Sequence, residues 1–451
     1  MAAGFICDAT DASVIFARMI PERIVIVGGG AAGFFAALAC AESRRAAEIL
    51  ILEKTAQFLT KVKISGGGRC NVTHACFDAR ELTTRYPRGE RALISPFQQF
   101  SAADTVAWFE QHGVKLKSEA DGRMFPVTDS SQTIIDCLVN AANEAGIKLK
   151  PNCGVEGVIK RPDERFSVSL ERRAPTRPAS GAVPLLAETV LGVPAAGGII
   201  SCDKLLLATG GCRTPALGQL AVSLGHTLEA PVPSLFTFHI ETPWLRELAG
   251  VSLEAVEVSV PGTKLRERGA LLLTHWGLSG PAVLRLSAWG ARELHGRNYH
   301  FSLQVNWLPH LNGEKLATEF QKLRQSQPAK YITNTPLATL PERLWEQLVI
   351  ASGVPRDTRW AALSGGAQHR LGQQLLRSEF AVTGKSLNKD EFVTCGGVKL
   401  NEVNFKTMAS KICPGLFFAG EILDIDGITG GFNFQAAWTT GWLAGRAMAG
   451  E

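Results

Sequence analysis

A strand–glycine–helix segment near the N-terminus is the feature that most constrains how this chain can fold. Residues 22–27 (ERIVIV) form a short apolar, β-branched run, which is typical of a buried parallel strand. The run leads into Gly28, Gly30 and Gly33, and the Ala-rich residues 34–40 that follow indicate a helix. In a GxGxxG turn the first glycine makes the tight turn, the second lets the backbone approach a pyrophosphate, and the third lets helix and strand pack closely. The segment therefore predicts an α/β domain that binds a dinucleotide.

A second strand that ends in an acid supports this prediction. Residues 48–53 (EILILE) end at Glu53, twenty residues after the last glycine of the turn. A carboxylate at that position accepts hydrogen bonds from the ribose hydroxyls of an adenosine. We expect the free N–H groups at the start of the first helix, at Ala31 and Ala32, to face the pyrophosphate. Lys54, which follows the acid, is expected beside the same nucleotide.

Two later segments favour FAD over NAD as the dinucleotide. Residues 203–211 form a strand that ends in an ATGG turn, as in flavoproteins of the two-dinucleotide-binding superfamily. Residues 415–421 form another buried strand that ends in Gly plus an acid. The resemblance to that superfamily implies that the carboxylate of such a segment, here Glu421, hydrogen-bonds the ribityl chain of FAD. The helix predicted at 430–438 would direct its positive N-terminal end at the flavin and stabilise the anionic reduced ring. The residues expected to contribute are Thr209, Gly210, Gly211, Gly420, Glu421, Gly430, Gly431, Phe432 and Asn433.

A run of three glycines forms a second candidate loop for the phosphates and the flavin. Consecutive glycines expose backbone N–H groups and permit positive φ, which suits a concave anion site. Arg69 adds a fixed positive charge, and Asn71 offers an amide to the flavin edge or to a substrate. The expected cofactor residues are Lys61, Ser65, Gly66, Gly67, Gly68, Arg69, Cys70 and Asn71, to which we add Asp426 from a later motif.

Six motifs give the chain its resemblance to a known family. They are residues 61–73 (KVKISGGGRCNVT), 122–126 (GRMFP), 274–281 (THWGLSGP), 396–398 (GGV), 419–427 (AGEILDIDG) and 429–433 (TGGFN). Spread over residues 23–447, these motifs resemble the BaiN/YhiN-type flavoprotein family of NAD(P)/FAD-dependent oxidoreductases. The resemblance implies an α/β fold, namely an FAD/NAD(P)-binding Rossmann-like domain with an inserted domain. That insertion is expected to be a β-barrel with a small helical part.

The predicted elements agree with this organisation. We expect a tail at 1–22, the first part of the FAD-binding domain at 23–212, the inserted domain at 213–385 and the last part of the FAD-binding domain at 386–451. Helices are predicted at 101–113 and 130–146, a small β-meander from strands at 147–150, 155–160 and 166–170, and a surface excursion at 171–198. In the insertion, strands are predicted at 252–260, 269–274 and 299–307, and helices at 282–295, 313–325 and 337–350.

Composition excludes several classes of protein. The ten cysteines form no CxxC pair and no cluster with zinc spacing, so we expect reduced thiols, no metal and a cytoplasmic protein. No uncharged apolar run reaches about 18 residues, so no membrane-spanning helix is expected. Without a CxxC or a second GxGxxG, the chain does not fit the disulfide reductases. The sequence indicates no particular oligomeric state.

Two residues are candidates for catalysis. Cys70 lies next to Arg69, and a neighbouring cation favours the thiolate, so the thiol could act as a proton donor or a nucleophile. An inert buried thiol is the alternative. His275 lies in a predicted loop before a helix, where it could act as an acid or a base, or could hold the loop through the backbone.

The expected reaction is the reduction of a C=C bond by an FAD enzyme that takes hydride transiently from NAD(P)H. The substrate would bind between the FAD domain and the insertion, as ligands often do between domains. The resemblance to the BaiN/YhiN-type family implies two alternatives to this reaction. They are the reduction of uridine to dihydrouridine in ribosomal RNA and the oxidation of amines. The net charge of +5 allows an RNA partner as well as a small molecule. Basic clusters that could follow RNA phosphates are Lys61/Lys63/Arg69, Arg80/Arg85/Arg88/Arg91 and Lys264/Arg266/Arg268.

Overall fold

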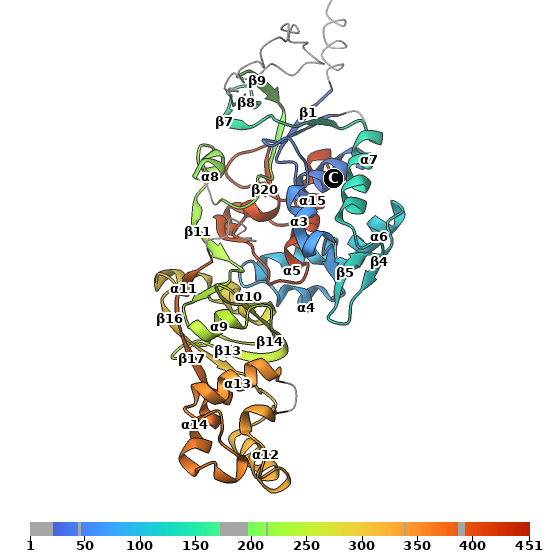
Figure 1. Cartoon of the computed structure of the whole chain (residues 1–451). Helices are drawn as coiled ribbons and strands as arrows, with labels where there is room; N and C mark the ends of the chain where they lie inside the picture. The colour runs from blue at the N-terminus through green and yellow to red at the C-terminus, as the bar shows by residue number, and fades with distance from the viewer. Residues whose placement is uncertain (1–20, 44–46, 172–196, 213–214, 338–339, 387–392) are drawn as a thin grey trace, which may run out of the picture. The chain divides into compact units, whose positions relative to one another are not determined.

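The chain forms two compact units, shown in Figure 1. The computed structural model describes residues 21–43, 47–171, 197–212, 215–337, 340–386 and 393–451. Unit 1 contains the chain up to Pro231 together with Gly396–Ile425 and Gly430–Glu451, and unit 2 contains Val232–Cys395 and Asp426–Thr429. A Rossmann-like unit with an inserted barrel unit confirms the predicted fold class. Most of the predicted tail at 1–22 and of the excursion at 171–198 lies outside the described residues.

The division between the units differs from the expected boundaries at 213 and 386. Helix α8 (Pro215–Val222) packs against β7 (Val155–Lys160) of unit 1, so residues 215–231 stay with that unit. Strand β11 (Leu228–Ser234) pairs with β18 (Val393–Val398) in a two-stranded sheet, and the division falls inside both strands.

A seven-stranded sheet forms the core of unit 1, in the order β19-β20-β21-β10-β1-β2-β6. Its parallel strands are β1 (Arg23–Val27), β2 (Glu48–Leu52), β6 (Lys148–Lys150), β10 (Lys204–Leu207) and β21 (Leu416–Phe418). The short strands β19 (Val403–Asn404) and β20 (Ala409–Ser410) add an antiparallel edge. Because β1, β2, β10 and β21 are parallel, their carboxyl ends lie at one edge, where ligands of such sheets bind.

Two helices pack closely against each other in unit 1. They are α2 (Ala31–Ser43) and α15 (Phe432–Ala449). A Cβ on Gly441 would lie 2.5 Å from the Ala32 carbonyl oxygen, and one on Gly445 would lie 2.3 Å from the Ala36 carbonyl oxygen. Glycine at these two positions therefore lets the C-terminal helix approach the helix that follows the glycine turn.

The remaining elements of unit 1 surround this core. The helices are α3 (Thr60–Gly68), α4 (Ala79–Thr83), α5 (Glu90–Gln99), α6 (Ala102–Gln111) and α7 (Ser131–Glu144), with 3-10 turns η3 (Leu400–Glu402) and η4 (Gly420–Ile422). The strands are β3 (Thr73–His74), β4 (Leu116–Ser118), β5 (Arg123–Pro126), β7 (Val155–Lys160), β8 (Phe166–Leu170) and β9 (Ile199–Cys202).

Local capping explains the two predicted helices, and strand pairing corrects the predicted meander. The Ser101 side chain accepts from the backbone of Asp104 while the Asp104 carboxylate accepts in return, which fixes the start of α6. The Ser130 side chain likewise accepts from Gln132 at the start of α7. The meander contains β7, β8 and β9, whereas residues 148–150 form β6 and pair with β2 in the main sheet.

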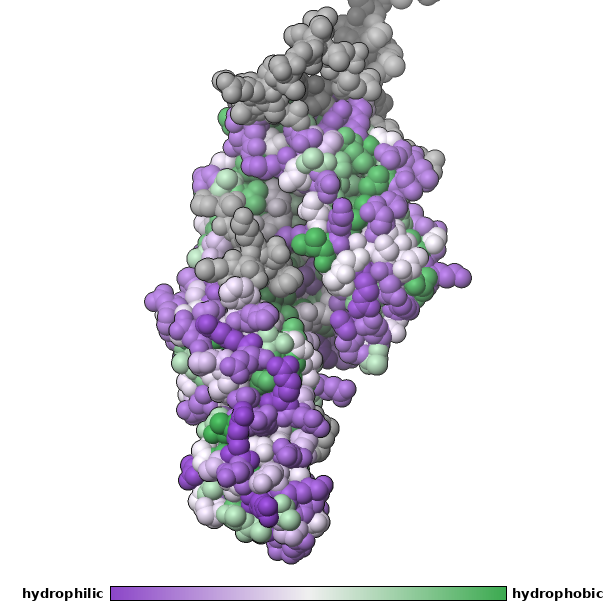
Figure 2. Space-filling view, in the orientation of Figure 1, coloured by the Kyte–Doolittle hydropathy of each residue, from purple (hydrophilic) through white to green (hydrophobic). Residues whose placement is uncertain are grey.

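Unit 2 is a closed six-stranded barrel with helices. The barrel order is β12-β15-β14-β13-β16-β17, with β12 (Phe238–Ile240), β13 (Ser252–Ser259), β14 (Arg266–Thr274), β15 (Gly277–Ser279), β16 (Phe301–Asn306) and β17 (Ser378–Lys385). The helices are α9 (Pro243–Glu247), α10 (Pro281–Trp289), α11 (Ala291–Gly296), α12 (Gly313–Ser326), α13 (Glu342–Ala351) and α14 (Gly365–Leu376). The face of this unit visible in Figure 2 is mainly hydrophilic.

The helix predicted at 282–295 is two helices in the structure. Gly290 ends α10 and begins α11, and a Cβ there would lie 2.7 Å from a methyl group of Leu265. In the helical part, the indole N–H of Trp345 donates to the Ile332 carbonyl and that of Trp360 donates to the Thr335 hydroxyl, both at 2.7 Å. Among the described residues, no helix is both long and apolar enough to cross a bilayer.

Candidate functional site

The glycine turn after β1 has the geometry that a pyrophosphate site requires. Gly28 has φ +114°, and a Cβ there would lie 2.2 Å from the Ala208 carbonyl oxygen. A Cβ on Gly33 would lie 2.1 Å from the Gly28 carbonyl oxygen, whereas one on Gly30 would have no neighbour within 4 Å. The first and third glycines therefore serve packing, and the second leaves open space at the start of α2 beside Ala31. This is the arrangement in which a helix N-terminus receives a phosphate group.

Three hydrogen bonds from within the protein hold the carboxylate of Glu53 in place. One carboxylate oxygen accepts from the Gly29 N–H at 2.9 Å, and the other accepts from the backbone N–H and the hydroxyl of Thr55, both at 2.8 Å. The side chain remains partly exposed, so further lone pairs are available to hydroxyl donors. Lys54 instead forms an exposed ion pair with Glu171 at 2.7 Å, so its charge is already compensated by a carboxylate.

The predicted residues Lys61, Gly210 and Glu421 come together in unit 1. The Lys61 ammonium forms an ion pair with the Glu421 carboxylate, and it lies 3.9 Å from the position of a Cβ on Gly210. The N–H of Gly420 donates to the hydroxyl of Thr440 at 2.9 Å, which links the start of η4 to α15. Thr440 is a residue that the sequence did not point to, because the bond joins two segments without a local motif.

A buried polar atom without a partner marks the same region. The hydroxyl oxygen of Thr209 is shielded from solvent and has no hydrogen-bond partner among the described residues. Its Cα lies 3.1 Å from the position of a Cβ on Gly28, so it adjoins the glycine turn. Buried hydroxyls in proteins are almost always paired, and an unpaired one at a ligand site is satisfied by the ligand. The site therefore fits a polar dinucleotide.

The triple-glycine loop is a left-handed turn. Helix α3 is interrupted at Ser65, and Gly66, Gly67 and Gly68 have φ values of +57°, +69° and +86°. The Ser65 carbonyl accepts the N–H groups of Arg69 and Cys70, which closes the loop. A Cβ on Gly66 would lie 2.9 Å from the Phe125 ring, whereas Gly67 and Gly68 have open space. Consecutive backbone N–H groups in this conformation can line an anion site.

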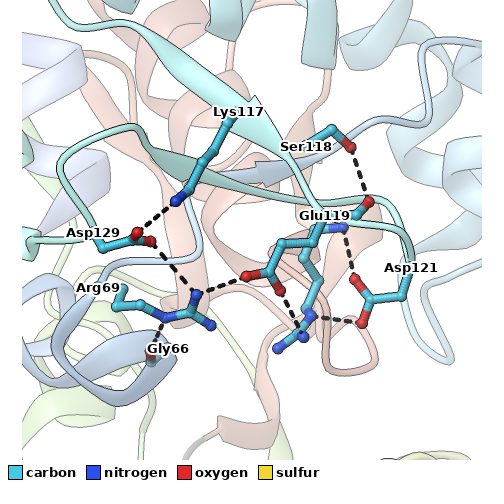
Figure 3. A network of polar contacts seen from close by, with 8 residues as sticks. Gly66, Arg69, Lys117, Ser118, Glu119, Asp121 and Asp129 are labelled. Carbon is cyan, nitrogen blue, oxygen red and sulfur yellow. Dashed lines mark hydrogen bonds and ion pairs between the residues drawn. The ribbon is translucent and has the colours of Figure 1, made fainter.

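Arg69 is compensated by carboxylates rather than left as a free charge. Figure 3 shows the guanidinium of Arg69 between the carboxylates of Glu119 and Asp129. Its Nη1 atom lies 2.6 Å from Glu119 Oε1 and 3.5 Å from Asp129 Oδ1. Its carbon atom also lies 3.9 Å from the centre of the Phe125 ring. The Glu119 hydrogen bond raises the pKa of Arg69, with a smaller contribution from Asp129. Arg69 therefore ties the glycine loop to β5 and the segment after β4, and less of its charge remains for a phosphate than the sequence suggested.

Cys70 does not have the thiolate character expected from its neighbour. The residue has no exposed surface, and burial raises the pKa of its thiol to about 12, against a lowering by the Ser65 hydrogen bond. Arg69 points to Glu119 and does not offset the desolvation. Of the two readings that the sequence left open for Cys70, burial favours the inert thiol, because loss of hydration outweighs a cation that is already paired.

Asn71 joins the triple-glycine loop to the start of α15. Its amide nitrogen donates to the Thr73 carbonyl at 3.0 Å, and its amide oxygen accepts from the Gly431 N–H at 2.9 Å. A Cβ on Gly431 would lie 2.6 Å from the Thr73 carbonyl, so only glycine fits there. The Tyr86 hydroxyl donates to the Phe432 carbonyl at 2.6 Å, a contact 346 positions apart that no local signal revealed. Asn71 thus positions the helix end that was expected to face the flavin.

Two of the predicted residues, Asp426 and His275, lie in unit 2. Asp426 is fully buried and accepts from the Ser234 hydroxyl at 2.7 Å. His275 is exposed in the turn between β14 and β15. The sequence predicted a loop that leads directly into a helix, but β15 separates this turn from helix α10. The structure therefore shows one set of expected residues gathered in unit 1 and two others within the inserted unit.

The carboxyl edge of the unit 1 sheet carries the glycine turn at Gly28–Gly33, the segment Gly420–Glu421 and the N-terminus of α15. Together these features define an FAD-dependent oxidoreductase. Two family models match the chain, the HI0933-like protein Rossmann domain at residues 22–183 and the HI0933-like protein barrel and H2TH domain at residues 232–393. The chain belongs to the HI0933-like family. The predicted resemblance to BaiN/YhiN-type flavoproteins is thereby confirmed.

Curated relatives span nearly the whole chain. A protein of Escherichia coli strain K12 named ribosomal RNA dihydrouridine synthase is 31% identical over 436 residues, which is 94% of this chain and 97% of the relative. A protein of Clostridium scindens named 3-dehydro-bile acid delta(4,6)-reductase is 27% identical over 436 residues, with 95% and 99% covered. Among solved structures, the 3-ketosteroid delta1-dehydrogenase of Sterolibacterium denitrificans has a TM-score of 0.50 at 12% identity, covering 95% of this chain and 100% of that one. This last likeness concerns the fold alone.

Proposed function

We propose that this protein uses NAD(P)H to reduce a C=C bond conjugated to a carbonyl, and that its substrate is a uridine of ribosomal RNA. The observation that carries the proposal is the 31% identity with a ribosomal RNA dihydrouridine synthase over 94% of the chain. The 27% identical bile-acid reductase has a name that describes the same kind of chemistry on a small molecule. Uracil has its C5=C6 bond conjugated to the C4 carbonyl, so one type of site can serve both substrates.

The reaction needs two electrons and two hydrogens. Bound FAD would pass a hydride from NAD(P)H to one alkene carbon, and a proton from solvent or a side chain would complete the neighbouring carbon. The residues of this chain would bind and orient the cofactor for that transfer. The open backbone at Gly30 would receive the pyrophosphate and Glu53 the adenosine ribose, while the Lys61–Glu421 pair would bind the ribityl segment.

Helix α15 would contribute the electrostatic part of the site. The helix has 18 residues and no acidic side chain in its first turn, so the positive end of its dipole is not neutralised locally. Asn71 and Tyr86 hold that end through Gly431 and Phe432. A positive helix end stabilises negative charge that develops on a nearby ring.

Charge on the surface supports an RNA substrate less than the sequence suggested. Arg69 pairs with Glu119, Arg85 lies 3.5 Å from Glu81, and Arg266 pairs with Glu257. Exposed cations of the same clusters are Lys63, Arg80, Arg91, Lys264 and Arg268. These five would remain available for RNA phosphates.

The test is a product assay on two substrate classes. Purified protein with FAD and NADPH or NADH would be incubated anaerobically with unmodified ribosomal RNA fragments, and separately with a conjugated steroid ketone. We expect the RNA to gain two hydrogens per modified uridine by mass spectrometry, and a Glu53→Gln variant to require more FAD for the same rate. Reduction of the ketone alone would replace RNA by a small molecule as substrate. Reduction of the flavin by an amine instead of NAD(P)H would replace the reductase by an amine oxidase.

A further inference from the structure

His74 is clamped beside the start of α15. It ends the short strand β3, and its ring stacks on Phe432 with the ring centres 4.7 Å apart and the planes 21° apart. On another side, a Cβ on Gly122 would lie 2.4 Å from the ring carbon Cε1, so this position accepts only glycine while the ring stays in place. The ring carbon Cδ2 lies 3.6 Å from the position of a Cβ on Gly430. The imidazole therefore has a fixed orientation next to the turn that leads into the helix.

The hydrogen bonding of His74 determines which nitrogen carries the proton. Nε2 lies 3.1 Å from the carbonyl oxygen of Asp121. A carbonyl oxygen only accepts, so Nε2 is the N–H donor and Nδ1 presents a lone pair. Burial lowers the pKa of His74, and the charge of Arg85 acts in the same direction, while the Asp121 carbonyl and the Asp121 and Glu81 charges oppose it. The ring is therefore mainly neutral near pH 7, with Nδ1 as an acceptor.

Two polar atoms in this neighbourhood lack a partner among the described residues. One is Nδ1 of His74, which is shielded from solvent. The other is Nε of Arg85, a donor that is likewise buried. Arg85 belongs to the segment after α4 and directly precedes Tyr86, whose hydroxyl donates to the Phe432 carbonyl at 2.6 Å. The unpaired acceptor and the unpaired donor thus belong to two segments that both contact Phe432 at the start of α15, and buried groups of this kind normally find partners.

We infer that His74 Nδ1 accepts a hydrogen bond from the N–H of a bound cyclic imide, and that Arg85 Nε donates to one of the flanking carbonyls of the same group. A cyclic imide presents a donor between two acceptors, which complements this pair. Both the flavin ring and uracil carry the group, so the inference rests on the proposed function and narrows the ligand to this chemistry. His74 is then a positioning residue of the site.

The test compares two substitutions that each keep half of the imidazole. His74→Asn retains an acceptor near the position of Nδ1, whereas His74→Gln retains a donor near Nε2 and lacks that acceptor. FAD affinity would be measured by fluorescence titration of the apoprotein, using FAD and N3-methyl FAD. Steady-state kinetics would use ribosomal RNA fragments containing uridine or N3-methyluridine, and circular dichroism would confirm that both variants fold.

If the imide belongs to flavin, His74→Gln weakens FAD binding about tenfold and His74→Asn much less. Wild type would then disfavour N3-methyl FAD, and the Gln variant would not. If the imide belongs to uracil, FAD affinity is unchanged and His74→Gln raises KM for RNA about tenfold with little change in kcat. Arg85→Gln should act in the same assay as His74→Gln.

Unchanged FAD affinity and unchanged KM in the folded Gln variant would overturn the inference while leaving the proposed function intact. Equal losses in the Asn and Gln variants would overturn it as well, because they would show that ring packing and not the acceptor is what matters. The proposed function can also fail while the inference holds. Wild type that forms no dihydrouridine but discriminates against N3-methyl FAD through His74 would reject the proposed substrate and support the inference.

Discussion

The three glycines of the first turn make different demands on the chain. Gly28 and Gly33 stand against carbonyl oxygens at distances where a Cβ cannot fit, and Gly28 also has a positive φ. Gly30 has neither restriction, since a Cβ there meets nothing within 4 Å. The fold therefore does not require glycine at position 30, although packing requires it at positions 28 and 33. We infer that the open space beside Gly30 is there for a ligand.

Substitution by alanine should separate these roles. We expect Gly30→Ala to change the free energy of unfolding by less than about 0.5 kcal/mol and to weaken FAD binding at least about tenfold. Gly33→Ala should lower the free energy of unfolding by about 2 kcal/mol or more, because its methyl group meets the Gly28 carbonyl. Urea unfolding of the apoproteins and FAD titration measure the two effects. A destabilised Gly30→Ala with normal FAD affinity would contradict this assignment.

Cys70 gives a second prediction for a single residue. Because burial raises the pKa of its thiol to about 12, the side chain stays protonated at neutral and mildly alkaline pH. We expect the native protein at pH 8 to leave Cys70 unlabelled by iodoacetamide, and the urea-unfolded protein to be labelled there. Mass spectrometry of the peptide containing Cys70 gives the readout, and the partly exposed Cys153 in the same sample serves as a positive control. Rapid labelling of Cys70 in the native protein would contradict this prediction and support a reactive thiolate at that position.

At the scale of secondary-structure elements, His226 links three segments of unit 1. Its side chain is fully buried, Nδ1 lies 2.9 Å from Glu402 of η3, and Nε2 lies 2.8 Å from the hydroxyl of Ser410 in β20. The order Ser–His–Glu resembles a hydrolase triad. The Ser410 oxygen, however, also accepts the N–H groups of Ile412 and Cys413 at 3.0 Å and 2.7 Å, so its lone pairs are engaged in a turn. The network therefore fixes the β20 edge.

This network predicts a specific dependence of stability on pH. Burial lowers the pKa of His226, against the opposing effect of the hydrogen bond that Glu402 accepts from it. Burial alone would raise the pKa of Glu402, but hydrogen bonds from Thr227 and His226 lower it. The unfolded histidine takes up a proton below about pH 6.5 while the folded one resists it. The stability contribution is thus present above about pH 6.5 and is lost as the pH falls toward 5.

Unfolding of wild type and His226→Gln in urea between pH 5 and 7.5 measures this contribution. Wild-type stability should fall more steeply with decreasing pH, by up to about 1.4 kcal/mol per pH unit more than the variant. His74 titrates in both proteins, so the difference isolates His226. The lowered pKa of Glu402 adds a loss only at more acidic pH, below its unfolded value near 4.5. Parallel pH profiles would show that His226 does not carry the effect.

Elements with a strong local signal were predictable, and those fixed by distant contacts were not. The apolar runs at 22–27 and 48–53 and the serine caps at 101 and 130 contain the information for their own strands and helices. Strand β6 joins the main sheet because of its pairing with β2, which its three residues cannot signal. The cofactor glycines followed from a local motif, whereas His74, Tyr86 and Thr440 acquire their roles only through contacts with the C-terminal segments.

At the scale of the whole molecule, the FAD-binding unit is assembled from segments at both ends of the chain. Strands β1, β2 and β10 come from its first half, and β21 and α15 come from its last 36 residues. The barrel unit is inserted between them in the sequence. Removal of the C-terminal segment would delete both Gly420–Glu421 and the start of α15, so the cofactor site requires segments from both ends of the sequence.

The most direct test of the central claim is the absorbance spectrum of the FAD-loaded protein under anaerobic conditions during addition of NADPH or NADH, followed by ribosomal RNA. We predict that a nicotinamide bleaches the visible flavin band and that uridine-containing RNA restores it without oxygen, since electrons then pass to the C=C bond. Protein that binds no flavin, or a flavin band that neither nicotinamide bleaches, would contradict the account.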